Sequence, residues 1–138
     1  MRNLFFFLMI VVLVGCSSTA KFDSNTVEGA FSIAESYEKD ERYEEAIAQF
    51  QQVKNKYPYS RLDIESELHI AEIYFKREDF VEAQGAYQTF KELHPSHLKS
   101  DFVTYRLGLS LFNQLPSTID RDLSVAEKAL LYFEEVVT

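Results

Sequence analysis

The sequence is poor in the residues that mark disulfide scaffolds and β-rich folds. Its 138 residues include one cysteine, three prolines, four glycines and no tryptophan. A single cysteine cannot form an intramolecular disulfide, so a disulfide-stabilised scaffold is excluded. No segment alternates strictly between apolar and polar residues, as a half-buried β-strand does. The sequence therefore does not predict a sheet.

Positive charge is scarce as well. Lysine and arginine number 14 against 22 acidic residues, which leaves a net charge of −8 at pH 7. A nucleic-acid-binding surface needs clustered cations to neutralise phosphates, so this class of protein is disfavoured. The net charge also disfavours adsorption to anionic lipid through charge alone.

The one long hydrophobic run lies at residues 4–14. As a helix it would span roughly 16 Å, which is too short for a hydrocarbon core of about 30 Å. Arg2 precedes the run and small residues follow it, which is the pattern of a secretory signal peptide. We therefore assign residues 1–15 to a signal peptide and not to the fold.

The signal ends in a bacterial lipobox-like motif of Leu13, Val14, Gly15 and Cys16. The resemblance implies that Cys16 receives a diacylglyceryl thioether, becomes the first residue after cleavage and is then N-acylated. Two or three acyl chains anchor a protein firmly, whereas one chain holds only marginally. The alternative is an ordinary signal peptide with a chance cysteine. Residues 16–26 would form the lipidated N-terminus and a polar linker. Apart from the covalent lipid on Cys16, the sequence predicts no cofactor.

The rest of the chain has helical periodicity. Apolar residues recur at three- and four-residue spacing, as in Ala30, Ile33, Ala34 and Tyr37. This spacing places them on one face of a helix. The mature chain is therefore predicted to be all-α.

An internal repeat indicates how the helices are arranged. Residues 37–58 align without a gap over residues 74–95, at an offset of 37. The matched pairs are Tyr37 with Tyr74, Tyr43 with Phe80, Ala46 with Ala83, Phe50 with Tyr87, Val53 with Phe90, and Pro58 with Pro95. Alanine allows two helices to cross closely, the aromatic residues fill the gap to the next pair, and proline ends the second helix.

This pattern resembles the tetratricopeptide repeat, a helix–turn–helix unit of about 34 residues. The resemblance implies a solenoid of antiparallel helix pairs over residues 27–138, with repeats at about 27–58, 64–95 and 101–138. The third repeat carries nine extra residues between its helices, around 113–121. The alternative is a generic helical bundle.

The third repeat lacks a terminating proline. Its second helix reaches Thr138 with Phe133, Val136 and Val137 still available to a neighbour. The last repeat of a solenoid needs a polar outer face. We therefore expect the sequence to be the N-terminal part of a longer chain.

Three segments sharpen the resemblance to the lipoprotein family of the outer-membrane β-barrel assembly machinery. They are NKYPYS at 55–60, HPSHLKSDFVTYRLGLS at 94–110 and DRDLSVAEKALLYFEEVV at 120–137. The resemblance implies a non-enzymatic periplasmic adaptor, held by lipid to the inner leaflet of the outer membrane. The implied partners are BamA-like assembly subunits and unfolded outer-membrane proteins, whose extended C-terminal segment ends in an aromatic residue. The alternative is another tetratricopeptide lipoprotein that organises a periplasmic protease or a cell-wall complex.

The first helices of stacked repeats line a groove, which is the expected partner-binding surface. The candidate residues are Phe31, Glu35, His69, Glu72, Phe75, Phe102, Tyr105 and Arg106. The same helix faces carry Glu28, Ser32, Glu38, Glu65, Leu68, Leu109 and Phe112. The aromatic residues would hold apolar side chains, and Arg106 would take a terminal carboxylate. The alternative for each is ordinary packing between helices.

Tyr57 and Tyr59, on either side of Pro58, form a second candidate surface. Their alternative role is to close the hydrophobic seam between repeats.

Catalysis has little support in the sequence. His69 with Glu72, and His94 with His97 and Asp101, resemble partial metal-ligand sets, but each lacks a further strong ligand at a fixed spacing. No glycine-rich phosphate loop and no G-x-S-x-G motif is present. The sequence therefore predicts no catalytic residue, no metal and no enzyme, and a hydrolase or metal enzyme remains the weakest alternative.

Overall fold

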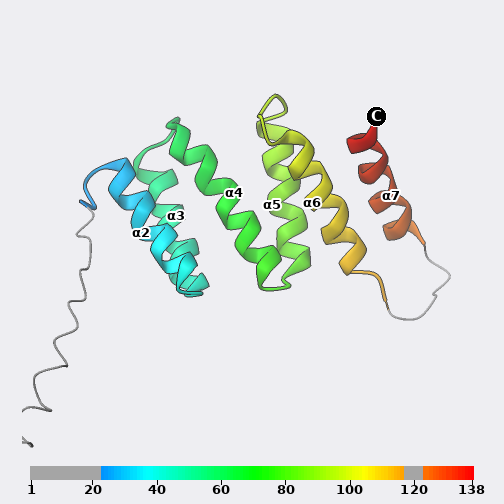
Figure 1. Cartoon of the computed structure of the whole chain (residues 1–138), viewed down its shortest axis with the longest axis horizontal. Coiled ribbons are helices and arrows are strands. Elements are labelled where there is room, and N and C mark those ends of the chain that lie inside the picture. The colour runs from blue at the N-terminus through cyan, green and yellow to red at the C-terminus, as the bar shows by residue number, and fades with distance from the viewer. Residues whose placement is uncertain (1–22, 117–122) are drawn as a thin grey trace, which may run out of the picture.

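The computed structural model describes residues 23–116 and 123–138, which form helices (Figure 1). Short turns join the helices between residues 27 and 113. In chain order the helices are α2 (Val27–Lys39), α3 (Tyr43–Lys56), α4 (Arg61–Lys76), α5 (Phe80–Leu93), α6 (Ser100–Asn113) and α7 (Ser124–Val137). These two ranges contain no strand, and none of their helices is long and apolar enough to cross a membrane. The all-α class is confirmed.

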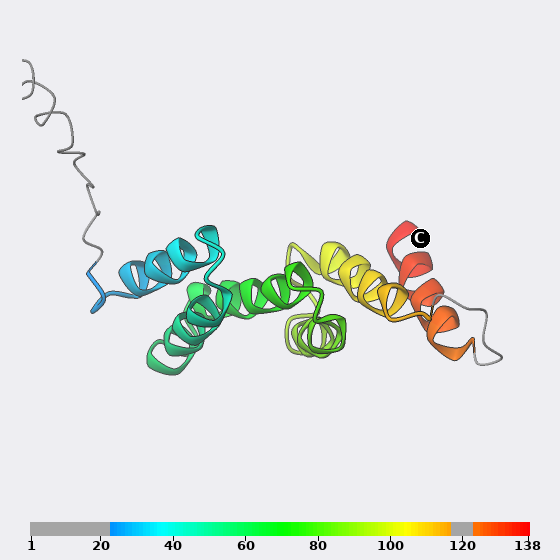
Figure 2. The same cartoon turned by 90° about the horizontal axis from the view of Figure 1, so that it is seen from below.

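The helices form three antiparallel hairpins, α2 with α3, α4 with α5, and α6 with α7. Each helix packs against its neighbour in the chain, and α2 also contacts α4. Figure 2 shows α2, α4 and α6 in a row, with α3 and α5 on one side of that row. The opposite face of the row is therefore lined by first helices. This is the arrangement of a tetratricopeptide solenoid, as the repeat predicted.

The offset of 37 residues recurs in the backbone of the turns. Glu41 and Glu78 both adopt the left-handed conformation, with φ of 57° and 64°. The turn before α3 is closed by a hydrogen bond from the Arg42 N–H to the Tyr37 carbonyl, at 2.9 Å. The bond from the Asp79 N–H to the Tyr74 carbonyl, at 3.0 Å, closes the matching turn before α5. The two repeats therefore share backbone geometry as well as sequence.

The helix ends follow local chemistry. The Thr26 side chain accepts from the Gly29 N–H at the start of α2, and Ser60 accepts from the Asp63 N–H at the start of α4, both at 3.0 Å. These caps satisfy backbone donors that have no partner within the helix. Proline follows two residues after the end of α3 and of α5, where it prevents the helix from continuing.

Small and aromatic residues fill the core in the predicted way. The alanines at the helix crossings, Ala34, Ala46, Ala71 and Ala83, have no exposed surface. Phe50 and Tyr87, the matched aromatic residues of the second helices, are also fully buried. Burying such aromatic side chains contributes much of the stability of a small core.

The third hairpin packs through a glycine. A Cβ atom on Gly108 would lie 2.7 Å from Cε1 of Phe133 and 3.3 Å from the Ala129 carbonyl oxygen. The approach of α6 to α7 therefore depends on the missing side chain of Gly108.

Several sequence predictions fall on residues 1–22 and 117–122. The signal peptide, the lipobox at residues 13–16 with Cys16, and much of the insertion at 113–121 lie outside the described residues.

Candidate functional site

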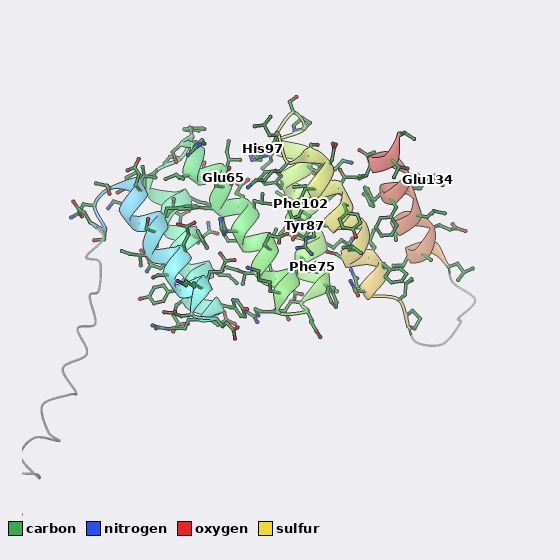
Figure 3. All side chains as sticks on the ribbon, in the orientation of Figure 1. Glu65, Phe75, Tyr87, His97, Phe102 and Glu134 are labelled. Carbon is green, nitrogen blue, oxygen red and sulfur yellow. The ribbon has the colours of Figure 1, made fainter. Side chains whose placement is uncertain are left out.

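A cavity of about 480 Å³ opens on the face lined by first helices. We call it the first-helix groove. Its lining residues are Glu38 of α2, Leu68, His69, Glu72 and Lys76 of α4, Lys99 just before α6, and Phe102 of α6. Figure 3 labels Phe102, in the first turn of α6, and Glu65, near the start of α4. Three successive repeats therefore contribute to one site.

Glu38 joins the first repeat to the second. One carboxylate oxygen accepts from Nδ1 of His69 at 2.6 Å and the other accepts from Nζ of Lys76 at 2.5 Å. The Glu38 side chain is only 10% exposed. Burial opposes its ionisation, but the hydrogen bonds from His69 and Lys76 outweigh this effect and lower the pKa of Glu38. Glu38 is therefore a fixed anion at neutral pH.

The His69 ring is held by aromatic residues of the first repeat. It stacks on Phe50 with ring centroids 4.8 Å apart, and it meets Phe31 edge-on at 5.4 Å. Phe31 is 8% exposed and does not line the groove. Its contacts are those of a packing residue that supports His69.

Glu72 is the centre of a second polar network. It accepts hydrogen bonds from the Tyr87 hydroxyl and, at 3.0 Å, from Nη2 of Arg106. Burial, together with the bond to Glu72, raises the pKa of Tyr87, so its hydroxyl stays a proton donor. The network links α4, α5 and α6.

Arg106 lies between two aromatic rings. Its guanidinium carbon is 4.5 Å from the centroid of Phe75 and 5.2 Å from that of Phe102, within the range of cation–π contacts. Its Nε atom is buried and has no hydrogen-bond partner among the described residues. Arg106 is therefore held by Glu72 and the two rings, and a ligand carboxylate would compete with Glu72 for it.

Lys99 completes the charged wall of the groove. Its Nζ atom donates to Glu65 at 2.9 Å. Burial raises the pKa of Glu65, but the bond from Lys99 outweighs this effect and the net shift is downward. Each basic side chain described so far thus has a glutamate partner.

Exposed aromatic residues continue along α6 from the groove. Phe102 is 39% exposed at the groove, and Tyr105 and Phe112 are exposed further along the same helix. The Tyr105 ring lies 5.9 Å from that of Phe133, outside the groove. Glu35 is exposed on α2 and also lies outside it. The structure thus brings His69, Glu72 and Phe102 together, with Phe75 and Arg106 beside them.

Lys76 and Lys99 are groove residues that the sequence analysis missed. Lys76 follows His69 by seven residues, a spacing that returns to the same helix face. This signal was available in the sequence. Lys99 lies just before α6, so helical periodicity does not indicate the direction of its side chain.

The two tyrosines of the second candidate surface have different surroundings. The Tyr57 hydroxyl donates to the Asn25 carbonyl at 2.7 Å. The Tyr57 ring packs against the hydrophobic cluster that contains Phe50 and Val53. Tyr59 is 98% exposed. Tyr57 therefore closes the seam between α2 and α3, whereas Tyr59 faces solvent.

The histidines of the partial metal sets have other partners. His94 pairs through Nε2 with Glu67 at 2.8 Å, and Glu67 also pairs with Lys54 at 3.0 Å. Within residues 23–116 and 123–138, no group of three or more potential metal-ligating side chains lies together.

Comparison with known protein families gives a match over most of the chain. The model of the family described as YfiO, outer membrane lipoprotein, matches residues 23–138. No curated protein matches the chain. The family match covers both ranges of described residues and includes the first-helix groove.

Proposed function

Because the chain belongs to the BamD-type (YfiO) family of outer membrane lipoproteins, we propose that it is a non-enzymatic scaffold of the outer-membrane β-barrel assembly machinery. In this proposal Cys16 carries the lipid and holds the protein on the inner leaflet of the outer membrane. The helices face the periplasm, where BamA-like subunits and unfolded outer-membrane proteins are the partners.

We propose that the first-helix groove receives the extended C-terminal segment of an unfolded outer-membrane protein. The observation that carries this proposal is the groove itself, which spans α2, α4 and α6 and has Phe102 exposed in its lining. Its volume of about 480 Å³ lies within the range of about 300–1,000 Å³ that ligand pockets occupy. An aromatic residue of the incoming segment would pack against Phe102.

The charges of the groove bear on the role of the terminal carboxylate. Arg106 and Lys99 are already paired with Glu72 and Glu65. A ligand carboxylate that binds Arg106 must compete with the existing ion pair between Arg106 and Glu72. Only the difference in strength between the two ion pairs contributes to affinity. The capture of the carboxylate by Arg106 stays a prediction, and the aromatic contact is the stronger part of the proposal.

Substitution of Phe102 by alanine tests this function. We expect Phe102→Ala to weaken binding of a peptide that copies the last strand of an outer-membrane protein. The loss of an aromatic contact is worth about 0.5–1.5 kcal/mol, or about 2- to 12-fold in affinity. Calorimetric titration of the processed chain measures the change.

Val81→Ala is the matched control, because Val81 is exposed on α5 and does not line the groove. Equal affinity of the Phe102→Ala and Val81→Ala proteins would contradict the proposed site. The same peptide with an amidated C-terminus reports on Arg106: if Arg106 takes the carboxylate, amidation weakens binding, and Arg106→Glu removes the difference between the two peptides.

A further inference from the structure

The chain enters the solenoid along one of its two edges. Figure 1 shows the start of α2, the α3–α4 turn and the α5–α6 turn along this edge, and Figure 3 labels His97 on it. The α2–α3 and α4–α5 turns lie along the other edge. We call the first the anchor edge, defined by residues 23–26, 57–60 and 94–99. The second is the far edge, defined by residues 40–42 and 77–79.

The segment that follows the lipidation position is bound to the anchor edge. The Tyr57 hydroxyl donates to the Asn25 carbonyl at 2.7 Å, and Nζ of Lys56 donates to the Ser24 carbonyl at 3.4 Å. Ser24 is eight residues from Cys16, and a chain of that length reaches at most about 30 Å when fully extended. A lipid on Cys16 would therefore hold this edge within about 30 Å of the leaflet.

Two large side chains project from the turns of the anchor edge. Tyr59 is 98% exposed and Leu98 is fully exposed. Tyr59 has φ of 68°, in the left-handed region that aromatic residues rarely adopt, and its N–H donates to Asp63 at 3.0 Å. This bond holds the turn in the conformation that presents the ring. Tyrosine suits the boundary between lipid and water because its ring is apolar and its hydroxyl is polar.

Charge is divided unevenly between the two edges. Residues 54–63, around the α3–α4 turn of the anchor edge, contain three basic residues and one acidic residue. Residues 91–101, around the α5–α6 turn, contain two of each together with two histidines. With Asp23 and Glu28 at the start of α2 and Glu134 and Glu135 at the end of α7 included, this edge has five basic and seven acidic residues. Around the turns of the far edge, residues 38–45 and 76–82 contain eight acidic and four basic residues. An anionic surface therefore repels the far edge more than the anchor edge, although the whole chain is acidic.

We propose that the anchor edge rests on the phospholipid surface of the leaflet that holds the lipid anchor, with Tyr59 and Leu98 in the headgroup region. This inference rests on the lipid anchor of the proposed function. Because the helices run from one edge to the other, their axes then stand away from the membrane and the first-helix groove opens sideways above it. A protein joined to its lipid by a flexible linker, without contact between the solenoid and the membrane, would have no such fixed orientation.

The absence of tryptophan from the chain allows a direct test. Tyr59→Trp and Leu98→Trp each introduce a single reporter at the anchor edge. Val81→Trp is the matched control, because Val81 is an exposed apolar residue in the first turn of α5, next to the far edge. The lipidated chains are reconstituted into phosphatidylethanolamine–phosphatidylglycerol vesicles with or without brominated acyl chains. We expect brominated lipid to quench the Tyr59→Trp and Leu98→Trp emission, and the Val81→Trp emission to stay unchanged.

Each other outcome counts against the inference in a distinct way. Equal emission with and without bromine at all three positions, in chains that float with the vesicles, would overturn the membrane contact and leave the anchor intact. Equal quenching at all three positions would overturn the orientation. If the chain floats no better than its Cys16→Ser variant, the lipid anchor is refuted and this inference with it. Circular dichroism of each variant checks that the helices are retained.

Discussion

At the residue scale, the groove is held by ion pairs between repeats. Glu38 of the first repeat binds His69 and Lys76 of the second, while Glu72 of the second binds Arg106 of the third. Such pairs add little to stability when exposed, but breaking a partly buried pair leaves a charge without a partner. Glu38 is the clearest case because it serves two donors.

Replacement of Glu38 by glutamine should weaken the contact between the first and second repeats in a pH-dependent way. At about pH 7 we expect Glu38→Gln to lower the free energy of unfolding by about 1–3 kcal/mol. The pKa of Glu38 is lowered from its ordinary value of 4.5, so its stabilising effect is present above that value. The effect is lost as the pH falls through the folded-state pKa. The difference in free energy of unfolding between variant and parent should therefore shrink in strong acid. Urea unfolding at about pH 7 and in strong acid measures this change.

Glu35→Gln is the control, since Glu35 lies one turn earlier on α2 and is exposed. A Glu38→Gln protein that stays less stable than the parent by the same amount at both pH values would count against this role of Glu38.

At the element scale, two glycines in helices have opposite surroundings. A Cβ atom on Gly85 of α5 would meet nothing within 4 Å, whereas one on Gly108 of α6 would meet Phe133 and the Ala129 carbonyl. Glycine inside a helix costs about 0.5–1 kcal/mol relative to alanine, because it loses more backbone freedom on folding. Of these two glycines, Gly108 alone has a packing reason for its presence.

Alanine substitution at each glycine tests this difference. We expect Gly85→Ala to raise the free energy of unfolding by about 0.5–1 kcal/mol. Gly108→Ala should lower it, because the Phe133 ring and the backbone of α7 must move to admit the new methyl group. Parallel urea unfolding curves measure both changes. Equal stabilisation by the two substitutions would show that α6 and α7 tolerate a wider separation.

At the scale of the whole molecule, the groove depends on the stacking of three repeats. Two hydrophobic clusters follow one another along the solenoid, and Tyr74 packs against both. In a solenoid each repeat contacts chiefly its neighbours, so a surface that spans several repeats forms only when they stack in register. The first-helix groove has this property, because its walls come from α2, α4 and α6.

Affinity purification tests the partners of the assembled molecule. From outer membranes solubilised in mild detergent, we expect the lipidated, tagged chain to recover a BamA-like subunit and unfolded outer-membrane proteins. The Cys16→Ser variant, which would lack the anchor, should recover less of both. Recovery of a periplasmic protease or a cell-wall enzyme without any barrel-assembly subunit would contradict the proposed function and favour another adaptor role.

The site could be predicted only in part from the sequence. Helical spacing places His69, Glu72 and Phe102 on the correct helix faces, and these residues do meet in the groove. The same spacing includes Phe31, but it does not reveal that Phe50 and His69 cover this ring. Periodicity gives the direction of a side chain from its own helix axis, and it contains no information on what the next helix places against it.

The sequence alone determined the helical class, the three hairpins and the offset of 37 residues, because apolar spacing and helix-ending residues act over short distances along the chain. Tertiary structure decided which charges meet. The pairing of Glu38 with Lys76 and of Glu72 with Arg106 joins residues 38 and 34 positions apart, and the crossing of successive repeats sets these contacts. It also decided that Tyr57 is tied to Asn25 while Tyr59 projects into solvent. Two tyrosines on either side of one proline thus differ because, among the described residues, the Tyr57 side chain meets a distant part of the chain and the Tyr59 side chain does not.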